Sequence, residues 1–224
     1  MPAVRQSILD GTFHRFACPA CARVLQVEKL LAYTDFPRRH WLTVVPERDL
    51  ALRSRWVRFA DVTFQMTMTE RAAPIVQSWA PEFTRRVVFG LASLREKLVL
   101  FDEGLDDRLI ELLKLDLRRD LGLLADPFAY LFVTRRNSST SLLVEYPLPG
   151  ATGATGELEL PLDDYARLGD ADPDELAARV PGMWDGLVVD HRVLFIRDEE
   201  AGEPDLPAAA ALPVMGEDMS GGDA

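Results

Sequence analysis

Cysteine, histidine and lysine are all scarce in this 224-residue chain, which has two cysteines, three histidines and three lysines. Two cysteines cannot build the disulfide framework that stabilises many small secreted domains. The histidines, His14, His40 and His191, lie far apart in the sequence and indicate no shared site. We expect His14 and His40 to lie on the surface and His191 to be a satisfied structural residue. The small number of lysines among 25 basic residues indicates a coding preference for arginine.

Long apolar runs are also missing. The longest apolar stretches, such as residues 87–92, are far shorter than the roughly 20 residues that a membrane-spanning helix needs. Residues 1–15 contain no apolar segment followed by a small-residue cleavage site, so no secretory signal is visible. We therefore expect a cytoplasmic protein that makes no contact with a membrane.

Positive charge is in deficit, because the formal net charge is -11. Residues 199–224 hold seven acids and no Lys or Arg, which leaves -4 for residues 1–198. A mildly acidic body repels phosphate backbones, so we expect no nucleic-acid partner. The paired arginines are expected to form solvated faces; they are Arg38-Arg39, Arg85-Arg86, Arg118-Arg119 and Arg135-Arg136.

Signatures of catalysis are absent as well. The sequence has no Gly-x-Ser-x-Gly elbow, and no Lys-Ser/Thr follows the glycines of residues 150–156 to make a phosphate loop. The acids of residues 102–107 do not fit a Ca²⁺ loop, and stabilisation of a helix start explains most of them. We name no catalytic residue and do not expect an enzyme.

The hydrophobic pattern that is present predicts an α+β fold. Leu109, Leu113, Leu117 and Leu121 are spaced by four residues and predict a helix over 105–121. Ser93 and Glu96 match a capping box, which predicts a second helix from Ser93 to about Phe101. Further helices are expected at 162–168 and 173–180, and a helix interrupted near Pro74 at 70–79.

Strands are expected at residues 41–45, 85–89, 130–134, 141–146, 157–160 and 187–196. Residues 62–68 alternate only weakly, and residues 23–33 fit either a strand or a helix. We predict three parts: a small N-terminal zinc-ribbon-like β segment at 1–47, a mixed helix and sheet body at 48–198, and a disordered acidic tail at 199–224.

The two cysteines form the motif Cys18-Pro19-Ala20-Cys21. Two residues between thiolates let both sulfurs turn toward one tetrahedral Zn²⁺ ion, and backbone N–H groups in such a turn stabilise the sulfurs. A closed structural site needs four ligands, and this motif supplies two. His14, four residues upstream, could add a third, although a histidine beside arginines is more typical of a surface. Cys18 and Cys21 are the candidate metal ligands, and zinc is the candidate metal.

Residues 8–21 (Ile-Leu-Asp-Gly-Thr-Phe-His-Arg-Phe-Ala-Cys-Pro-Ala-Cys), followed by residues 32–35 and 41–46, resemble the CpXC proteins. This bacterial and archaeal family is named for its two Cys-Pro-x-Cys motifs. Residues 98–114 are similar to the C-terminal part of the family, so the resemblance touches residues 5–115 in two patches.

The resemblance implies an uncharacterised protein that binds zinc through two knuckles, of which Cys18 and Cys21 would be the second. The first knuckle is absent from the sequence, which begins a few residues before Ile8. Ala22 stands where the family often has Gly after the knuckle, and Thr34 stands where it often has His.

Three interpretations remain open. The chain could be a degenerate ribbon whose fold is held by packing, with Cys18 and Cys21 as free thiols. A partner could complete the zinc site, for example with the same two cysteines of a second copy. Alternatively, the start of the chain was assigned too late, and a first knuckle lies upstream.

The expected role is that of a non-enzymatic interaction or adaptor module, because ribbons commonly serve as interaction surfaces. Its partner would be another protein or a second copy of the chain. The competing class is a thiol-disulfide redox enzyme that uses Cys18 and Cys21. Such a fold has a strand before the motif and a helix directly after it, which lowers the thiol pKa. Residues 12–17 and 23–33 could imitate this order.

Overall fold

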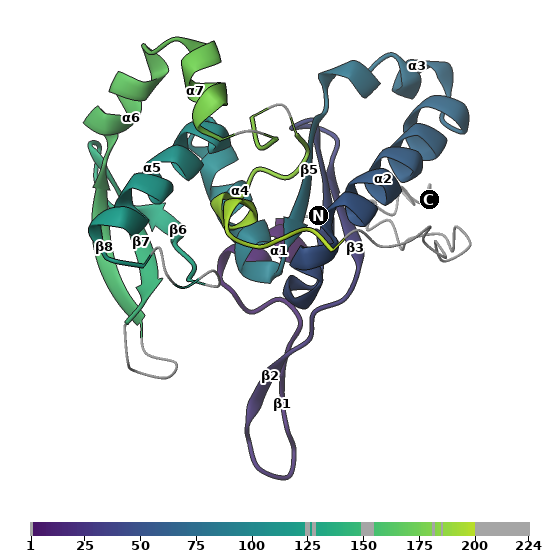
Figure 1. Cartoon of the computed structure of the whole chain (residues 1–224). Coiled ribbons are helices and arrows are strands. Elements are labelled where there is room, and N and C mark those ends of the chain that lie inside the picture. Colours follow the sequence, from purple (N-terminus) through teal and green to yellow (C-terminus); the bar gives the residue numbers. More distant parts are fainter. Residues whose placement is uncertain are drawn as a thin grey trace.

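The computed structural model describes residues 2–123, 126, 129–148, 155–180, 182–184 and 186–199 (Figure 1). Within these residues the chain forms seven α-helices, several short 3₁₀ or π-helical segments, and three small sheets. None of the helices in this described part is long and apolar enough to cross a membrane. The predicted α+β class is confirmed.

The first sheet is a two-stranded hairpin that follows a short helix. α1 (Pro2–Leu9) precedes β1 (Arg15–Ala17) and β2 (Val24–Gln26), which pair antiparallel. Residues 23–33, which fit either a strand or a helix, contain β2 and the start of the next strand. The strand interpretation is therefore correct.

The second sheet lies in the centre of the fold and has the order β3-β4-β5. β4 (His40–Val45) pairs antiparallel with β3 (Leu31–Asp35) and parallel with β5 (Thr84–Phe89). All six residues of β4 are buried, because helices and loops cover both faces of the sheet. The strands predicted at 41–45 and 85–89 are confirmed.

A helical crossover joins β4 to β5. It consists of η1 (Glu47–Leu52), α2 (Arg53–Phe64), the π-helical η2 (Gln65–Glu70), α3 (Pro74–Gln77) and η3 (Ala80–Glu82). Ala60, Phe64 and Met68 are buried at a spacing of four residues. The weak alternation of residues 62–68 is thus part of a helical pattern, and Pro74 opens α3 instead of interrupting a longer helix.

Two helices follow β5, namely α4 (Leu91–Asp102) and α5 (Asp107–Asp120). The leucine stripe predicted α5 correctly, and Gly122 follows its end with a φ of +69°. The predicted capping box is wrong, because α4 begins after Gly90, two residues before Ser93. The Ser93 hydroxyl donates instead to the carbonyl of Phe89 at 2.8 Å.

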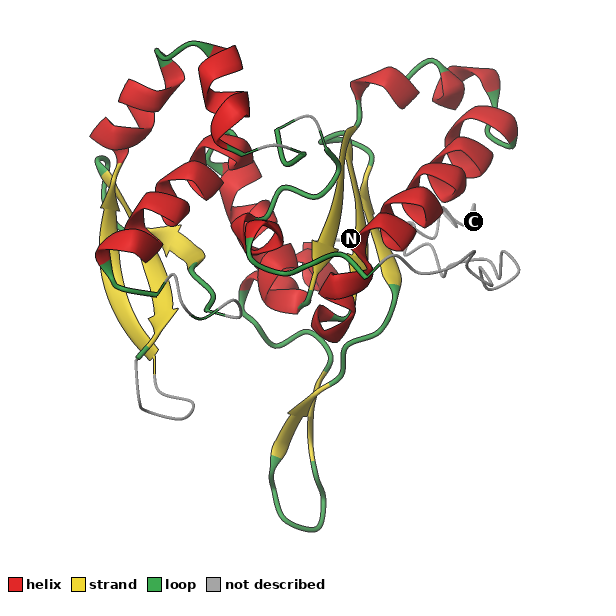
Figure 2. Cartoon of the chain, in the orientation of Figure 1, coloured by secondary structure: helices red, strands yellow, loops and turns green. Residues whose placement is uncertain are grey.

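The third sheet and two further helices complete the second half of the fold (Figure 2). β6 (Phe132–Arg136), β7 (Ser141–Pro147) and β8 (Thr155–Pro161) form an antiparallel meander, followed by α6 (Leu162–Gly169) and α7 (Pro173–Arg179). Leu100, Ile110 and Leu113 pack from α4 and α5 against this sheet. These strands and helices were predicted within a few residues.

The strand predicted at residues 187–196 is wrong. The carbonyl of Leu187 accepts one hydrogen bond from Val87 of β5, and the chain then turns into the 3₁₀ helix η4 (His191–Leu194). Asp190 explains the difference, since its carboxylate accepts a hydrogen bond from the backbone N–H of Arg192 and caps η4. Residues 187–199 are called the strap from here on.

The sequence predicted boundaries between parts of the chain at 47/48 and at 198/199. Along the chain, the predicted boundary at 47/48 falls between β4 and β5. These two strands pair with each other in one sheet. That boundary remains a prediction. In the predicted acidic tail, Glu199 is described and its N–H donates to Ala51. Residues 200–224 lie outside the described residues.

Gly90 is a position at which only glycine fits. Its backbone has φ +90° and ψ 159°, and an added Cβ would lie 3.1 Å from the Glu28 carboxylate and 3.3 Å from Glu47 Cβ. We expect Gly90→Ala to lower the free energy of unfolding by about 2 kcal/mol or more, measured by urea denaturation. Gly104→Ala is the matched control; Gly104 has φ +67° in open space, so the loss should be about 1 kcal/mol. Equal losses would contradict the steric argument.

Candidate functional site

The cysteine pair lies at the tip of a hairpin that projects from the rest of the fold (Figure 2). Residues 13–27 are called the hairpin from here on. Every residue of β1 and β2 is exposed, Cys18 is partly exposed and Cys21 is exposed. The structure therefore brings the two predicted ligands together on one accessible turn.

Backbone hydrogen bonds close this turn. The N–H of Cys18 donates to the carbonyl of Arg23, and the N–H of Ala22 donates to the carbonyl of Cys18, both at 2.8 Å. Ala22 has a φ of +57°, a left-handed conformation that costs a residue with a Cβ about 1 kcal/mol. The family resemblance places glycine at this position. The backbone is thus left-handed here although the residue is alanine.

The turn also stabilises a thiolate. Backbone N–H groups of Ala20 and Cys21 donate to the sulfur of Cys18, and the Cys21 thiol adds a further hydrogen bond. Together they lower the pKa of Cys18 below its ordinary value. Metal-binding cysteines are thiolates held in this way, so the two residues fit one half of a zinc site. Their assignment as ligands remains a prediction.

Of the three histidines, His40 does not lie where the sequence predicted it. His14 lies at the base of the hairpin, where its Nδ1 is 3.2 Å from the carbonyl of Val27. His40 was expected on the surface, but it is only 9 % exposed in β4, and its ring packs against Phe101 at 4.7 Å between centroids. Burial lowers the pKa of His40. His191 was expected to be structural; it is buried, and Glu111 holds its ring Nδ1, while its Nε2 has no hydrogen-bond partner among the described residues.

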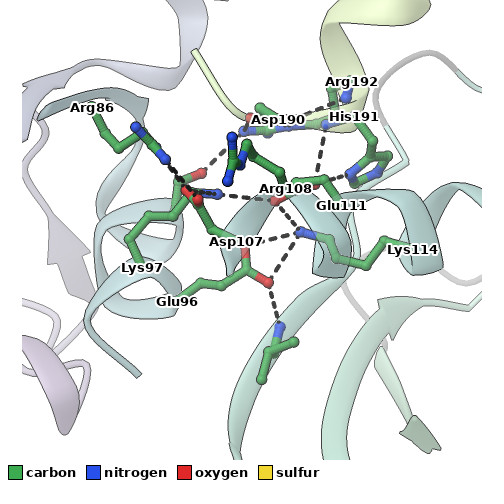
Figure 3. A network of polar contacts seen from close by, with 12 residues as sticks. Arg86, Glu96, Lys97, Asp107, Arg108, Glu111, Lys114, Asp190, His191 and Arg192 are labelled. Atoms are coloured by element: carbon green, nitrogen blue, oxygen red, sulfur yellow. Dashed lines mark hydrogen bonds and ion pairs between the residues drawn. The ribbon is translucent and has the colours of Figure 1, made fainter. Parts of the chain in front are cut away.

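A second polar site lies in the interior, between β5, α4, α5 and the strap (Figure 3). We call it the buried ion network; its members are Arg86, Glu96, Lys97, Asp107, Glu111, Lys114, Asp190, His191 and Arg192. With His191 neutral, its four acids are balanced by four bases. The members therefore balance one another in charge when all four acids are ionised, and Glu47, which Arg192 also contacts, lies at the half-exposed edge of the network.

Lys114 lies at the centre of the network. Its ammonium group is 2.9 Å from a carboxylate oxygen of Glu96 on α4 and 2.9 Å from one of Glu111 on its own helix. Lys97 bridges Glu111 at 3.2 Å and Asp107 at 3.1 Å. The two lysines thus tie α4 to α5 through shared carboxylates.

The strap joins the network through consecutive residues. The backbone N–H of His191 and its ring Nδ1 lie 3.1 and 2.7 Å from the same oxygen of Glu111. Arg192 binds Asp190 at 2.7 Å and also contacts Glu47 on η1. Because the Glu111 carboxylate can only accept, the neutral His191 ring carries its proton on Nδ1.

Burial and charge act in opposite directions on the two glutamates. Burial raises the pKa of Glu96, and Lys114 offsets only part of this effect. Burial would also raise the pKa of Glu111, but Lys114 and Lys97 more than offset it and hold that pKa well below its usual value. Glu111 is therefore the carboxylate that stays ionised at the centre of the network.

The network encloses too little space for a substrate. The cavity among its side chains measures about 10 Å³, roughly what one water molecule needs. Glu111, Asp190 and His191 do place donor atoms within 4.8 Å of one another, as a metal site would. A divalent cation would add two positive charges to a balanced cluster and compete with the lysines for Glu111. We interpret the network as structural.

Sequence reasoning missed this network, although a signal for it exists. Two of the chain's three lysines, Lys97 and Lys114, are in it, at buried positions where the arginine-rich chain keeps the smaller ammonium group. Asp107 was assigned to helix-start stabilisation, but Asp106 caps α5 and Asp107 pairs with Arg86 at 2.9 Å.

All four arginine pairs were expected to be solvated, and in two of them one member, Arg86 or Arg118, is not, whereas Arg119 is exposed as predicted. Arg86 is half-buried against Asp107, and Arg118 is fully buried, with its guanidinium 4.0 Å from the ring centroid of Phe195. Arg118 also donates to the backbone carbonyl of Leu123 at 3.1 Å. Arg86 and Arg118 therefore make stabilising contacts inside the fold.

Removing the central lysine tests the network. Lys114→Met leaves Glu96 and Glu111 buried without their shared cation, so we expect the free energy of unfolding to drop by about 3–5 kcal/mol. Lys29→Met is the control, because Lys29 is exposed and should change it by less than about 0.5 kcal/mol. Chemical denaturation of both variants gives the comparison. A near-zero loss for Lys114→Met would show that the ion pairs contribute little.

His191 should make stability depend on pH. Burial lowers its pKa, only partly offset by Glu111. The unfolded ring gains its proton near pH 6.5 and the folded ring only at lower pH, so stability should fall as pH drops below about 6.5. His191→Asn keeps an N–H donor for Glu111 without titrating. We expect its melting temperature to fall less than that of the wild type between pH 7.5 and 5.5. Parallel curves would assign the dependence elsewhere, for example to His40.

The sequence profile of one family, described as CpXC protein, matches residues 1–114. The match covers half of the chain and includes the hairpin, the central sheet, α4 and the network residues up to Lys114. No curated protein and no solved structure matches the chain. This chain belongs to the CpXC protein family.

Proposed function

We propose that the chain is a non-enzymatic interaction module and that the hairpin is its docking element. The observation that carries the proposal is the distribution of exposed apolar side chains. Of the seven large hydrophobic residues exposed in the described part of the chain, four belong to the hairpin: Phe16, Val24, Leu25 and Val27. Such a concentration on a projecting element is typical of a binding surface.

The base of the hairpin is fixed to the body, which suits a docking element. Glu28 directly follows the hairpin, and its carboxylate accepts hydrogen bonds from the backbone N–H of Glu47 at 2.9 Å and of Leu91 at 3.2 Å. Glu28 therefore stabilises the start of both η1 and α4. A partner bound at the tip would be held at a defined position relative to the central sheet.

The body supports a non-enzymatic role. The buried ion network is charge-balanced and surrounds a cavity of about 10 Å³. Catalytic groups need access to a substrate, and this cluster has space for about one water molecule. The charged residues of this network thus hold the fold together, whereas Cys18 and Cys21 in the hairpin are accessible.

The alternative, a thiol-disulfide enzyme, has less support. That class requires a helix directly after the cysteine motif, and here β2 follows the turn. The lowered pKa of Cys18 comes from backbone N–H groups within the turn, as in a metal knuckle. The hairpin therefore favours metal-assisted docking over redox catalysis.

Substitution of the exposed apolar pair tests the proposal. We expect Phe16→Ser combined with Leu25→Ser to leave the free energy of unfolding within about 0.5 kcal/mol of wild type and to abolish association with the partner. Val62→Ser combined with Ile75→Ser is the matched control, because these side chains are 50 % and 62 % exposed on the crossover.

Self-association by analytical ultracentrifugation and affinity capture from cell extract provide the measurements. The proposal holds if the hairpin variant loses an association that the crossover variant keeps. It is wrong if both variants behave like the wild type in both assays.

A further inference from the structure

The hairpin turn presents half of a metal site. Cys18 and Cys21 share one turn, but a closed structural zinc site has four ligands. In the described part of the chain, the one cluster of three or more potential ligands is centred on Glu111 in the interior and contains no cysteine. The hairpin therefore offers two thiolates without further donors from its own fold.

One face of the hairpin is apolar and unpartnered. Phe16 and Leu25 are directly opposite each other in the β1–β2 register, so their side chains lie on the same face. Val27 directly follows the end of β2 and adds a third exposed apolar side chain to the hairpin. The three side chains are 57 %, 49 % and 46 % exposed. A second hairpin laid against this face would bury it on both copies.

The charge of the hairpin suits the same arrangement. Residues 11–27 contain no Asp or Glu, although the whole chain has a net charge of -11. Arg15 and Arg23 flank the cysteine motif on either side. One Zn²⁺ ion with four thiolates has two negative charges, and the arginines of two hairpins can compensate them. The hairpin projects from the rest of the fold (Figure 1), so two acidic bodies joined at their hairpins would stay apart.

We infer that the partner of the hairpin is a second copy of this chain, and that the two copies share one Zn²⁺ ion bound by Cys18 and Cys21 of each. This inference rests on the proposed function and names its partner. A twofold axis through the ion makes the two halves equivalent, as in most homodimers. The hairpin has 15 residues, fewer than the roughly 20–30 per side of a stable interface, so the dimer depends on the metal.

Native mass spectrometry with metal analysis tests the inference on the full chain. Protein expressed with zinc and kept reduced should contain one zinc ion per two chains, in a species of twice the 25.1 kDa chain mass. Removal of the ion with EDTA should weaken dimerisation by at least about 100-fold, and added zinc should restore it. Replacement of Zn²⁺ by Co²⁺ should give the absorption of a tetrahedral cobalt ion with sulfur ligands.

Variants separate the contributions of metal and surface. Cys21→Ser removes one of the two exposed donors and should abolish both zinc binding and dimerisation without loss of the fold. Phe16→Ser with Leu25→Ser should weaken the zinc-bound dimer, whereas Val62→Ser with Ile75→Ser should leave it unchanged. A dimer that persists in EDTA and in Cys21→Ser overturns the bridging metal. A monomer with one zinc ion per chain, or without zinc, overturns the inference altogether.

Failure of this inference is distinguishable from failure of the proposed function. If the zinc-loaded chain is a monomer, but hairpin substitution still abolishes capture of another protein, the hairpin docks to a foreign partner and only the present inference is wrong. If hairpin substitution changes neither self-association nor capture, both are wrong.

Discussion

The ammonium group of Lys114 lies between the carboxylates of Glu96 and Glu111 inside the protein, and the arrangement of the body depends on this contact. Ions without partners cannot remain in such an environment, because desolvation costs several kcal/mol for each charge. α4 and α5 must therefore pack in the one register that pairs these groups. His191 then attaches the strap to the free oxygen of Glu111.

This network connects the part of the chain that matches the family with residues that lie beyond it. Glu96 and Glu111 belong to the matched region 1–114, whereas His191 and Arg192 come from the strap. Arg192 reaches Ser93 on α4, and Val133 of β6 donates its N–H to Glu96. Side chains or backbone groups from η1, β5, α4, α5, β6 and the strap thus meet at one set of charges.

The hairpin is the opposite case, because its residues take no part in this network. Its two strands are exposed throughout, and a two-stranded hairpin is marginally stable in water by itself. Backbone bonds at Cys18 and the Glu28 carboxylate at its base hold it in place. In our proposal, the exposed apolar side chains beside the cysteine pair form the surface that binds a partner.

Local patterns predicted much of the fold because they report local physics. The leucine stripe from Leu109 predicted α5, and the β-branched runs before Pro46 and after Arg85 predicted two strands of the central sheet. Predictions failed where a distant partner decides the conformation. Glu96 resembled a cap but binds Lys114, and residues 187–196 resembled a strand but turn so that His191 binds Glu111, 80 positions earlier in the chain.

The sequence by itself determined the α+β class, the family resemblance and the two-cysteine turn, since each depends on residues close together in the chain. Only the tertiary structure decided that His40 is buried, that Lys97 and Lys114 share carboxylates, and that the apolar residues beside the cysteines face solvent. The reason is that the free energy of a charge or an apolar side chain depends on what surrounds it. Those surroundings come from distant segments, as in the contact of Arg192 with Glu47, 145 positions away.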